Sequence, residues 1–394
     1  MQLRHKFFLA LSLLTAVPLL VLLFGVVERV EREITVRTEQ ELHATLDKMA
    51  DELELLLNSQ MSIAKGLSRV PALRQVSAAA SDNDKTAYPK LAEHLEEFFL
   101  NYQHAVPSIQ ALRFIEPGGK TLVKVKEGKS VPAQMRDPAS GRLYVADQSR
   151  KSFFQRALAE KGDVSMSDFE LGQVTLDADF CPAMVRYSVK LKDELEGLEG
   201  LLVVNMWGKR VDTTVEASLG GYPGKPYIVE LNSRMEARDG IYLYHPENAQ
   251  RFADQLGTDF RLKNQLTAAE WEAINTNELG SLYRSDGRML FYRRFAPYKD
   301  AAAEWALVIE TASDQILAPV NNLRRGIWAL LAAVLLGSLL VAIWAAMRLT
   351  RPVNELADII TRYADGDHSV RFKGTGSDEI GSAGRAFNYL TSSL

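Results

Sequence analysis

The sequence predicts an α+β protein in which antiparallel sheets are attached to a long helix between two apolar segments. Three features of the 394 residues lead to this fold class. Two charge-free runs lie near the ends of the chain, a heptad repeat follows the first run, and the region between the runs contains paired strand-like segments around polar turns. The formal net charge of -4 shows no general basic excess for nucleic acid, and the single cysteine excludes a disulfide within the chain.

The apolar runs at residues 7–27 and 326–347 are each long enough to cross a membrane core of about 30 Å as a helix. The first run is too long for the apolar part of a cleaved signal peptide, and no small-x-small cleavage site follows it. We therefore expect two membrane-spanning helices, with residues 1–6 on the same side of the membrane as the end of the chain.

The orientation of these spans is predicted from the basic residues beside them. The basic residues that indicate a cytoplasmic location for both ends of the chain are Arg4, Lys6, Arg348 and Arg351. Arg324 and Arg325, on the other flank of the second run, favour the opposite orientation, but long loops cross membranes largely regardless of their charge. We expect a two-pass protein of the bacterial inner membrane whose long intervening region lies in the periplasm or outside the cell.

The first part of this region, residues 28–75, is predicted to be one long helix. Apolar residues repeat every seven positions in two seams, interrupted only by one glutamine. The seams consist of Leu42, Met49, Leu56 and Ile63, and of Leu46, Leu53, Gln60 and Leu67. Two interpretations remain open: the seams pack against the helix's own domain, or they pair with a second copy of the chain in a dimer.

Two groups of strand-like segments follow, at residues 76–214 and 222–315, on either side of the glycine-containing stretch SLGGYPGKP. The first group contains the hairpin IQALRFIEPGGKTLVKVK, with turn residues between two apolar runs, and a strand pair in PAMVRYSVKLKDELEGLEGLLVVNMW. The second group contains DGIYLYHPEN, GSLYRSDGRMLFYRRFAPY and EWALVIETA. Each group predicts one antiparallel-sheet module.

The order of these segments resembles the double Cache sensor domain of bacterial histidine kinases, diguanylate cyclases and chemoreceptors. The stretches LRFIEPGGKTLVKV and KSFFQRALAEKGDVSMSDFELG resemble the membrane-distal module of that family, and DGIYLYHPENAQRFADQLGTDFRL resembles its membrane-proximal module. The resemblance implies two tandem PAS-like sheets, with a small ligand such as a carboxylate, an amino acid or an amine bound in the distal module.

An anion site of this kind needs a cationic group and an aromatic wall. The forked guanidinium of Arg186 suits a carboxylate, although Arg186 and the two phenylalanines could instead be structural, paired with an acid or buried in the core. The ligand-binding residues expected from the resemblance are Lys151, Phe153, Phe154, Ser165, Ser167, Asp168, Arg186 and Tyr187. The amino-acid-binding form of the family carries Arg-x-Trp-Tyr where this chain has Lys-Ser-Phe-Phe, and this departure argues against amino-acid sensing. A small anion, most simply a carboxylate, is expected because Lys151, Arg186 and Tyr187 occur with the two phenylalanines in segments that resemble the family's ligand pocket.

Residues 348–394 resemble the HAMP linker, because two apolar-periodic helices flank the connector HSVRFKGTG. The expected seams are Leu349, Val353, Leu356, Ile360 and Tyr363 in the first helix, and Ile380, Ala383, Phe387, Leu390 and Leu394 in the second. Since one such hairpin cannot bury both seams, the resemblance implies a homodimer with a parallel four-helix bundle. The residues expected to carry the signal are Pro352, Gly366, Asp367, Glu379, Ile380 and Phe387.

The resemblance as a whole implies a receptor that relays ligand binding through the second span and the HAMP hairpin to a cytoplasmic output domain missing from this chain. The alternatives are the sensory half of a histidine kinase or diguanylate cyclase, truncated before its catalytic domain, and an adaptor without an output domain. The sequence predicts no cofactor, metal or catalytic site here. GGYPGKP lacks the Ser or Thr of a phosphate loop, and DADFCP lacks the glycine and final glutamate of a calcium loop.

Overall fold

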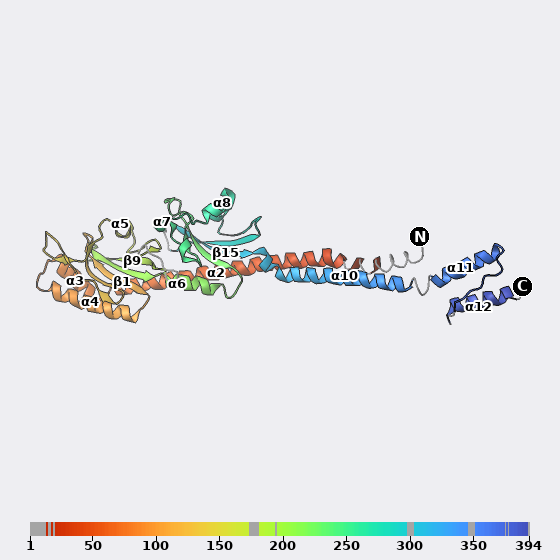
Figure 1. Ribbon diagram of the computed structural model, residues 1–394. Helices are drawn as coiled ribbons and strands as arrows, with labels where there is room; N and C mark the ends of the chain where they lie inside the picture. Colours follow the sequence, from red (N-terminus) through yellow and green to blue (C-terminus); the bar gives the residue numbers. More distant parts are fainter. Residues whose placement is uncertain are drawn as a thin grey trace. The chain divides into compact units, whose positions relative to one another are not determined.

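The structure, a computed structural model, divides into two compact units, residues 37–315 and residues 1–36 with 316–394. The residues that it describes are 13–14, 17–18, 20–172, 181–193, 195–297, 303–345, 351–374, 376 and 378–392. The first unit, called the sheet unit, contains two antiparallel sheets beside a long helix, and the second, called the helical unit, contains an apolar helix and a helical hairpin (Figure 1). The predicted α+β class is therefore confirmed.

The long helix α2 (Val27–Leu67) follows a π-helical turn, η1 (Leu22–Val26). Most of its predicted seam lies buried within the chain, at Leu42, Leu46, Met49, Leu53, Gln60 and Leu67. Leu56 and Ile63 are partly buried. The seam is therefore used for packing α2 on its own sheet unit, which is the first of the two interpretations that the sequence left open.

The first sheet, called the distal sheet, has the strand order β3-β2-β1-β10-β9-β7, with β6 beside β2 and β8 beside β9. Its strands are β1 (Ile109–Ile115), β2 (Lys120–Lys126), β3 (Lys129–Ser130), β6 (Ala146–Asp147), β7 (Val164–Met166), β8 (Glu170–Leu171), β9 (Ala183–Lys192) and β10 (Leu198–Trp207). A small separate hairpin consists of β4 (Met135–Arg136) and β5 (Leu143–Tyr144). The predicted turn between β1 and β2 requires Gly119, whose φ is +94° and whose Cβ would lie 2.7 Å from the backbone of Ser149.

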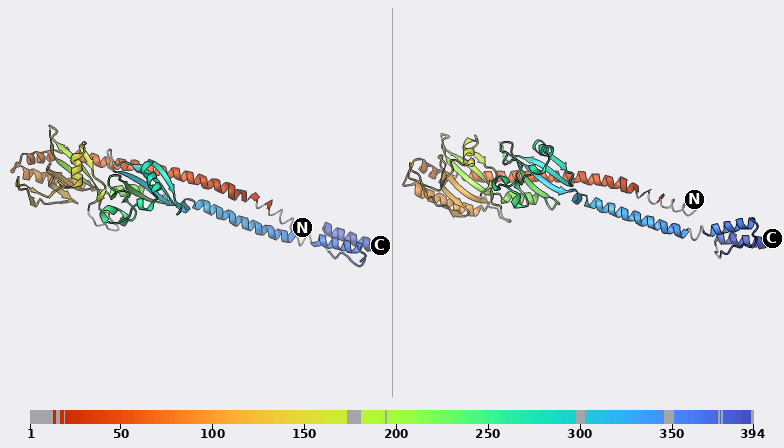
Figure 2. Two further views of the ribbon diagram at one scale, coloured as in Figure 1. Left: turned by 90° about the horizontal axis from the view of Figure 1, so that it is seen from above. Right: turned by 45° about the horizontal axis from the view of Figure 1, so that its top comes forward.

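Helices cover both faces of the distal sheet. Successive side chains of a strand point to opposite faces, and in β9 Tyr187 contacts Gln60 of α2 whereas Arg186 contacts Phe153 of α5 (Ser152–Ala159). Thus α2 and α5 lie on opposite faces. Helices α3 (Pro71–Ser81) and α4 (Tyr88–Ala105) lie on the side away from α5 (Figure 2). We call the other side the α5 face.

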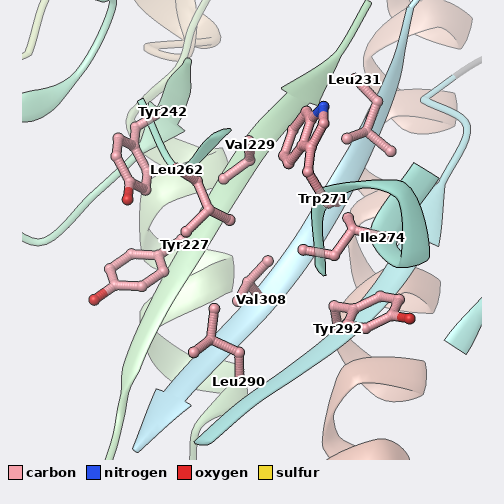
Figure 3. Close-up of a cluster of buried hydrophobic side chains, with 11 residues drawn as sticks. Tyr227, Val229, Leu231, Tyr242, Leu262, Trp271, Ile274, Leu290, Tyr292 and Val308 are labelled. Atoms are coloured by element: carbon pink, nitrogen blue, oxygen red, sulfur yellow. The ribbon is translucent and has the colours of Figure 1, made fainter. Parts of the chain in front are cut away.

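The second sheet, called the proximal sheet, has the order β12-β11-β15-β14-β13. Its strands are β11 (Lys225–Leu231), β12 (Tyr242–Tyr244), β13 (Leu279–Tyr283), β14 (Arg288–Phe295) and β15 (Glu304–Ala312). Between the strands lie α6 (Lys209–Ser218), η2 (Asn248–Gln250), α7 (Ala253–Leu256), η3 (Lys263–Gln265) and α8 (Ala268–Thr276). Trp271 and Ile274 of α8 pack on Tyr227, Tyr242 and Leu290 of the sheet, so side chains fill this face (Figure 3).

The helical unit contains α9 (Ser313–Ile316), which straddles the boundary, and α10 (Ala318–Ala345). Within the described residues, one helix is long and apolar enough to cross a membrane, at Ala318–Val341. It overlaps the predicted span at 326–347, of which residues 346 and 347 lie outside the described part. Much of the predicted first span, 7–27, also lies outside the described residues.

The predicted HAMP hairpin consists of α11 (Arg351–Ala364) and α12 (Glu379–Ser392). Pro352 lies in the first turn of α11, and Gly366, with φ +101°, follows its end. Asp367 pairs with Arg362 and accepts a hydrogen bond from Ser369, which holds the start of the connector. The hairpin core consists of Ile359, Val370 and Phe372, with Leu356, Tyr363, Ile380 and Phe387 packed against it.

Part of the predicted HAMP seam is exposed in the single chain. Val353 is 42% exposed, Ile360 46% and Leu390 63%, and Ala383 and Glu379 are exposed as well. The exposed seam residues Val353, Ile360, Ala383 and Leu390 leave the hairpin with an apolar surface that its own core does not cover. Leu349 and Leu394, the other two seam positions, lie outside the described residues.

Candidate ligand-binding site

Arg186 lies in a group of polar side chains on the α5 face of the distal sheet. Its Cζ atom is 5.4 Å from the centroid of the Phe153 ring, within reach of a cation–π contact. The strand register places Asn205 of β10 opposite Arg186. The Nε atom of Arg186 and the Oδ1 atom of Asn205 are both buried and have no hydrogen-bond partner among the described residues. Because buried polar atoms are rarely left unpaired, this face is suited to a ligand that supplies hydrogen bonds.

A second arginine, Arg113 of β1, contacts the same ring, with its Cζ atom 5.9 Å from the Phe153 centroid. The buried Nε of Arg113 has no hydrogen-bond partner in the described part of the chain. Burial and the charge of Arg186 lower the pKa of Arg113 to about 10. The cross-strand neighbour of Arg113 is Lys124 of β2. Burial, followed by the charge of Arg113, lowers the pKa of Lys124 to about 8, so both side chains are destabilised in their charged forms.

Two carboxylates lie near these cations, and both are already paired. Asp168 forms a two-point ion pair with Arg156 of α5, with both N–O distances at 2.9 Å. Glu170 of β8 forms an ion pair with Arg186. Among the described residues, no ion pair joins a carboxylate to Arg113 or Lys124. The α5 face therefore holds more positive than negative charge, and this imbalance is what a bound anion would neutralise.

The structure brings together part of the predicted set of ligand-binding residues. Phe153 and Arg186 are in contact, and Ser165 lies on the same face because its register partner is Ser188. The Ser167 hydroxyl accepts a hydrogen bond from the backbone N–H of Arg186 at 3.0 Å, so Ser167 holds the strand edge in place. Asp168 belongs to the same neighbourhood through its ion pair with Arg156.

Among the described contacts, none joins the side chains of the remaining three predicted residues to Arg113 or Arg186. Phe154 is buried in the same hydrophobic cluster as Phe153, with Ile115 and Leu201. Lys151 is exposed and immediately precedes α5. Tyr187 is fully buried on the opposite face, where its hydroxyl donates to Oε1 of Gln60 at 3.0 Å.

The predicted set did not contain Arg113, Lys124, Asn205 or Glu170. A sequence signal for two of them exists, because Arg113 interrupts the apolar strand IQALRFI and Lys124 interrupts TLVKV. Each is a charged residue at an inward position of a predicted strand, and buried charges of this kind often belong to functional sites. The pairing of distant strands, however, is not visible in the sequence.

In the proximal sheet, the arginines of β14 each have an acidic partner, because Arg288 pairs with Asp286 and Arg294 with Glu304. Tyr242 is buried in its core, and its hydroxyl accepts a hydrogen bond from Gln265 at 3.0 Å. The Tyr244 hydroxyl donates to Glu216 at 2.9 Å, and Arg293 forms an ion pair with Asp47 of α2. These contacts give the three side chains structural roles. In the described part of the chain, no group of three or more His, Cys, Asp and Glu side chains is arranged to hold a metal ion.

Comparison with known proteins adds two findings. Residues 344–394 match the HAMP domain family. The extracellular domain of vpHK1S-Z8, which is assigned as a histidine kinase, aligns with 73% of this chain and 96% of its own, with a TM-score of 0.53 and 15% identity. A domain of a protein assigned to the sensory box/GGDEF family, from Vibrio parahaemolyticus, aligns with 72% of this chain and 99% of its own, with a TM-score of 0.53 and 16% identity.

At this level of identity the structural likeness shows the fold. The sheet unit therefore has the same fold as these two domains, and residues 344–394, which follow it in the chain, match the HAMP domain. This combination matches a sensory receptor of the double Cache type with a HAMP linker, which is the class of protein that the order of segments predicts.

Proposed function

We propose that this chain is a signal-transduction receptor that senses a small organic anion, most simply a carboxylate, on the α5 face of the distal sheet. The observation that carries the proposal is the group formed by Arg113, Lys124 and Arg186, in which only Arg186 has an acidic partner among the described residues. Cations that are partly removed from water without an acidic partner are costly to keep in a fold. An anion that neutralises them would gain charge-assisted hydrogen bonds from both guanidinium groups.

The site also fits a carboxylate in its geometry. Two guanidinium groups share the ring of Phe153, so planar donors approach one region from two strands, β1 and β9. Guanidinium forks match the two oxygens of a carboxylate better than an ammonium does. Lys124 adds a point charge whose lowered pKa of about 8 makes its protonation sensitive to a bound anion.

The signal would pass through α10 and the HAMP domain to a cytoplasmic output domain or partner. We propose a two-pass topology in the bacterial inner membrane, with the sheet unit outside the cytoplasm and a second span at 7–27. We further propose a parallel homodimer, supported by the exposed seam residues Val353, Ile360 and Leu390 of the HAMP hairpin. Two hairpins together would cover these side chains in a four-helix bundle.

A second candidate is that the chain is the sensory half of an enzyme, a histidine kinase or a diguanylate cyclase. It is favoured by the two solved domains of like fold, which come from proteins assigned to a histidine kinase and to the GGDEF family. Both candidates share the same sensing site and differ only in the output. The gene's continuation beyond residue 394 distinguishes them.

The test is a thermal-unfolding screen of the full chain in detergent against acetate, succinate and citrate, with amino acids and amines as comparison sets. An anion present at 100 times its dissociation constant should add about 2.7 kcal/mol to the free energy of unfolding. Arg186→Ala should abolish that stabilisation, and Lys151→Ala should reduce it less because Lys151 is exposed beside α5. The proposal fails if only the amines stabilise the protein, or if Arg186→Ala binds the anion normally.

A further inference from the structure

The segment 167–171 connects the candidate anion site with the proximal sheet. On the distal side, Asp168 is fixed by its two-point ion pair with Arg156, and Glu170 is fixed by Arg186. The segment includes β8, which pairs with β9 through Glu170 and Leu171. Of its two acidic side chains, Glu170 is therefore held by Arg186, a residue that the anion would contact, and Asp168 is held by Arg156 of α5.

The side chain and backbone of Phe169 make contacts with the proximal part of the sheet unit. The Phe169 ring packs edge-on against Phe252, with centroids 5.6 Å apart, and in a tilted arrangement against Trp305 of β15, with centroids 6.0 Å apart. Its carbonyl oxygen accepts a hydrogen bond from Nη2 of Arg238 at 3.0 Å. The next contact is at Leu171, whose N–H donates to Oε1 of Gln255 at 2.8 Å.

Arg238 is itself held in place by buried acids of the proximal part. Its Nε donates to Glu230 of β11 at 2.9 Å, and its Nη1 donates to Asp254 at 2.9 Å. All three side chains are buried or nearly so. A buried arginine with two acidic partners and a carbonyl acceptor has little freedom to move alone, so a displacement of the Phe169 carbonyl would have to move its surroundings with it.

The backbone of Phe252, whose ring contacts Phe169, is held in a strained conformation. Phe252 has φ +51°, a left-handed conformation that is unfavourable for a bulky side chain. Such strain persists only where the surrounding structure imposes it, and it clusters at switching and binding sites. Here the strained residue is the one that packs edge-on against Phe169.

Contacts to the two sheets alternate along the segment. Asp168 and Glu170 pair with the distal cations Arg156 and Arg186, whereas Phe169 between them contacts Phe252 and Trp305. One short segment therefore carries alternating contacts to the two sheets. Trp305 lies in β15, the last strand before α9 and α10 in the chain.

We propose that the segment 167–171 is the element that couples the anion site to the proximal sheet, with Phe169 as its central positioning residue. The trigger rests on the proposed function: an anion that binds Arg186 competes with Glu170 and releases it. The ion pair Arg186–Glu170 then exists only in the anion-free state. The anion therefore binds more tightly to the state in which this ion pair is broken, and such a difference in affinity is what any ligand-driven change requires. Release of Glu170 loosens the segment, and Phe169 transmits the change to Phe252, Trp305 and β15.

The coupling is testable without any ligand, because Glu170→Gln removes the same ion pair. Hydrogen exchange of the full chain in detergent, read by mass spectrometry, should show faster exchange of backbone amides in residues 238–256 of Glu170→Gln than of the wild type. We expect an increase of about fivefold, the low end of ordinary coupling between sites. The matched control is Asp163→Asn, which removes an ion pair of the same module, with Lys192 at 2.9 Å, away from this segment, and should leave residues 238–256 unchanged.

A second variant tests whether the effect of Glu170→Gln reaches the proximal sheet through the segment 167–171. Phe169→Leu removes the ring that packs against Phe252 and Trp305 and keeps an apolar side chain at this buried position. In the Phe169→Leu background, Glu170→Gln should cause less than half of its original effect on residues 238–256. An effect of Glu170→Gln confined to the distal strands would overturn the proposal, as would an effect unchanged by Phe169→Leu. Neither result depends on anion binding, so it would leave the proposed sensing function standing.

Discussion

Arg113 and Arg186 lie on two strands that flank β10 and direct their guanidinium groups at one ring, that of Phe153, at 5.9 and 5.4 Å. The charge of Arg186 contributes to the lowered pKa of Arg113, so the two groups repel each other across this ring. Such an arrangement lowers stability while no anion is present. Binding sites often retain interactions of this kind because function requires them.

The first prediction concerns the stability of the anion-free protein. Arg113→Met should raise the free energy of unfolding by about 1 kcal/mol, because an uncompensated buried charge is replaced by an apolar side chain of similar length. The comparison variant is Arg238→Met, which leaves Glu230 and Asp254 buried without their partner. Arg238→Met should cost about 3–5 kcal/mol.

Chemical denaturation of the full chain in detergent, in buffer without organic acids, measures both values. A loss of stability in Arg113→Met as large as that in Arg238→Met would mean that Arg113 has a structural partner. The cation group would then no longer indicate an anion site.

The second prediction concerns pH and Lys124. Its folded pKa of about 8 lies below the unfolded value of 10.5. Between these two values the unfolded chain holds a proton that folded Lys124 has lost, so the stability of the anion-free protein should rise with pH in this window. An anion favours the charged lysine, so the stabilisation caused by the anion should decrease as the pH rises through about 8.

Thermal unfolding with and without succinate, from neutral pH to about pH 10, measures both trends. Lys124→Met should remove both, because no titrating group remains at that position. A pH dependence that persists unchanged in Lys124→Met would assign the titration to another residue.

The third prediction concerns competition at Arg186. Glu170→Gln removes the carboxylate that pairs with Arg186, so an organic anion should bind about tenfold more tightly, corresponding to about 1.4 kcal/mol. Isothermal titration of the full chain with the best anion from the screen gives the dissociation constants, and Asp163→Asn serves as the control. Weaker binding in Glu170→Gln would show that Glu170 contacts the ligand directly, for example through an ammonium group.

The sequence permits prediction of the strands and the turn at Gly119, because apolar runs around Pro and Gly report local structure. It also points to Phe153 and Arg186, which lie in segments with a family resemblance. Tyr187 is adjacent to Arg186 in sequence, but a strand turns adjacent side chains to opposite faces, and Tyr187 contacts α2 instead. Arg113 reaches the site only because β10 lies between β1 and β9, and such long-range strand order is not encoded in any local pattern.

The fourth prediction concerns topology. A reporter that fluoresces only in the cytoplasm should stay dark when it is fused near Gly221, within the sheet unit, and should fluoresce when it is fused after residue 394. The physical reason is that two spans, at 7–27 and 326–347, would return the chain to its starting side, with the basic residues Arg4 and Lys6 inside. Fluorescence from both fusions would mean that the sheet unit is not exported, and fluorescence from the Gly221 fusion alone would reverse the orientation.

The last prediction concerns assembly of the HAMP domain. Val353 is 42% exposed although it occupies a seam position, and a second hairpin would bury it against its symmetry mate in a parallel bundle. In a Cys181→Ser background, cysteine introduced by Val353→Cys should therefore cross-link two chains under mild oxidation. The matched control is Asn354→Cys, one position along α11 and also exposed, where the helical turn directs the side chain away from the bundle axis.

Leu356→Cys should cross-link less than Val353→Cys, because Leu356 already packs against the core of its own hairpin. Equal cross-linking at Val353 and Asn354 would mean that the seam is misassigned, and no cross-linking at either position in membranes would contradict a parallel dimer at this layer.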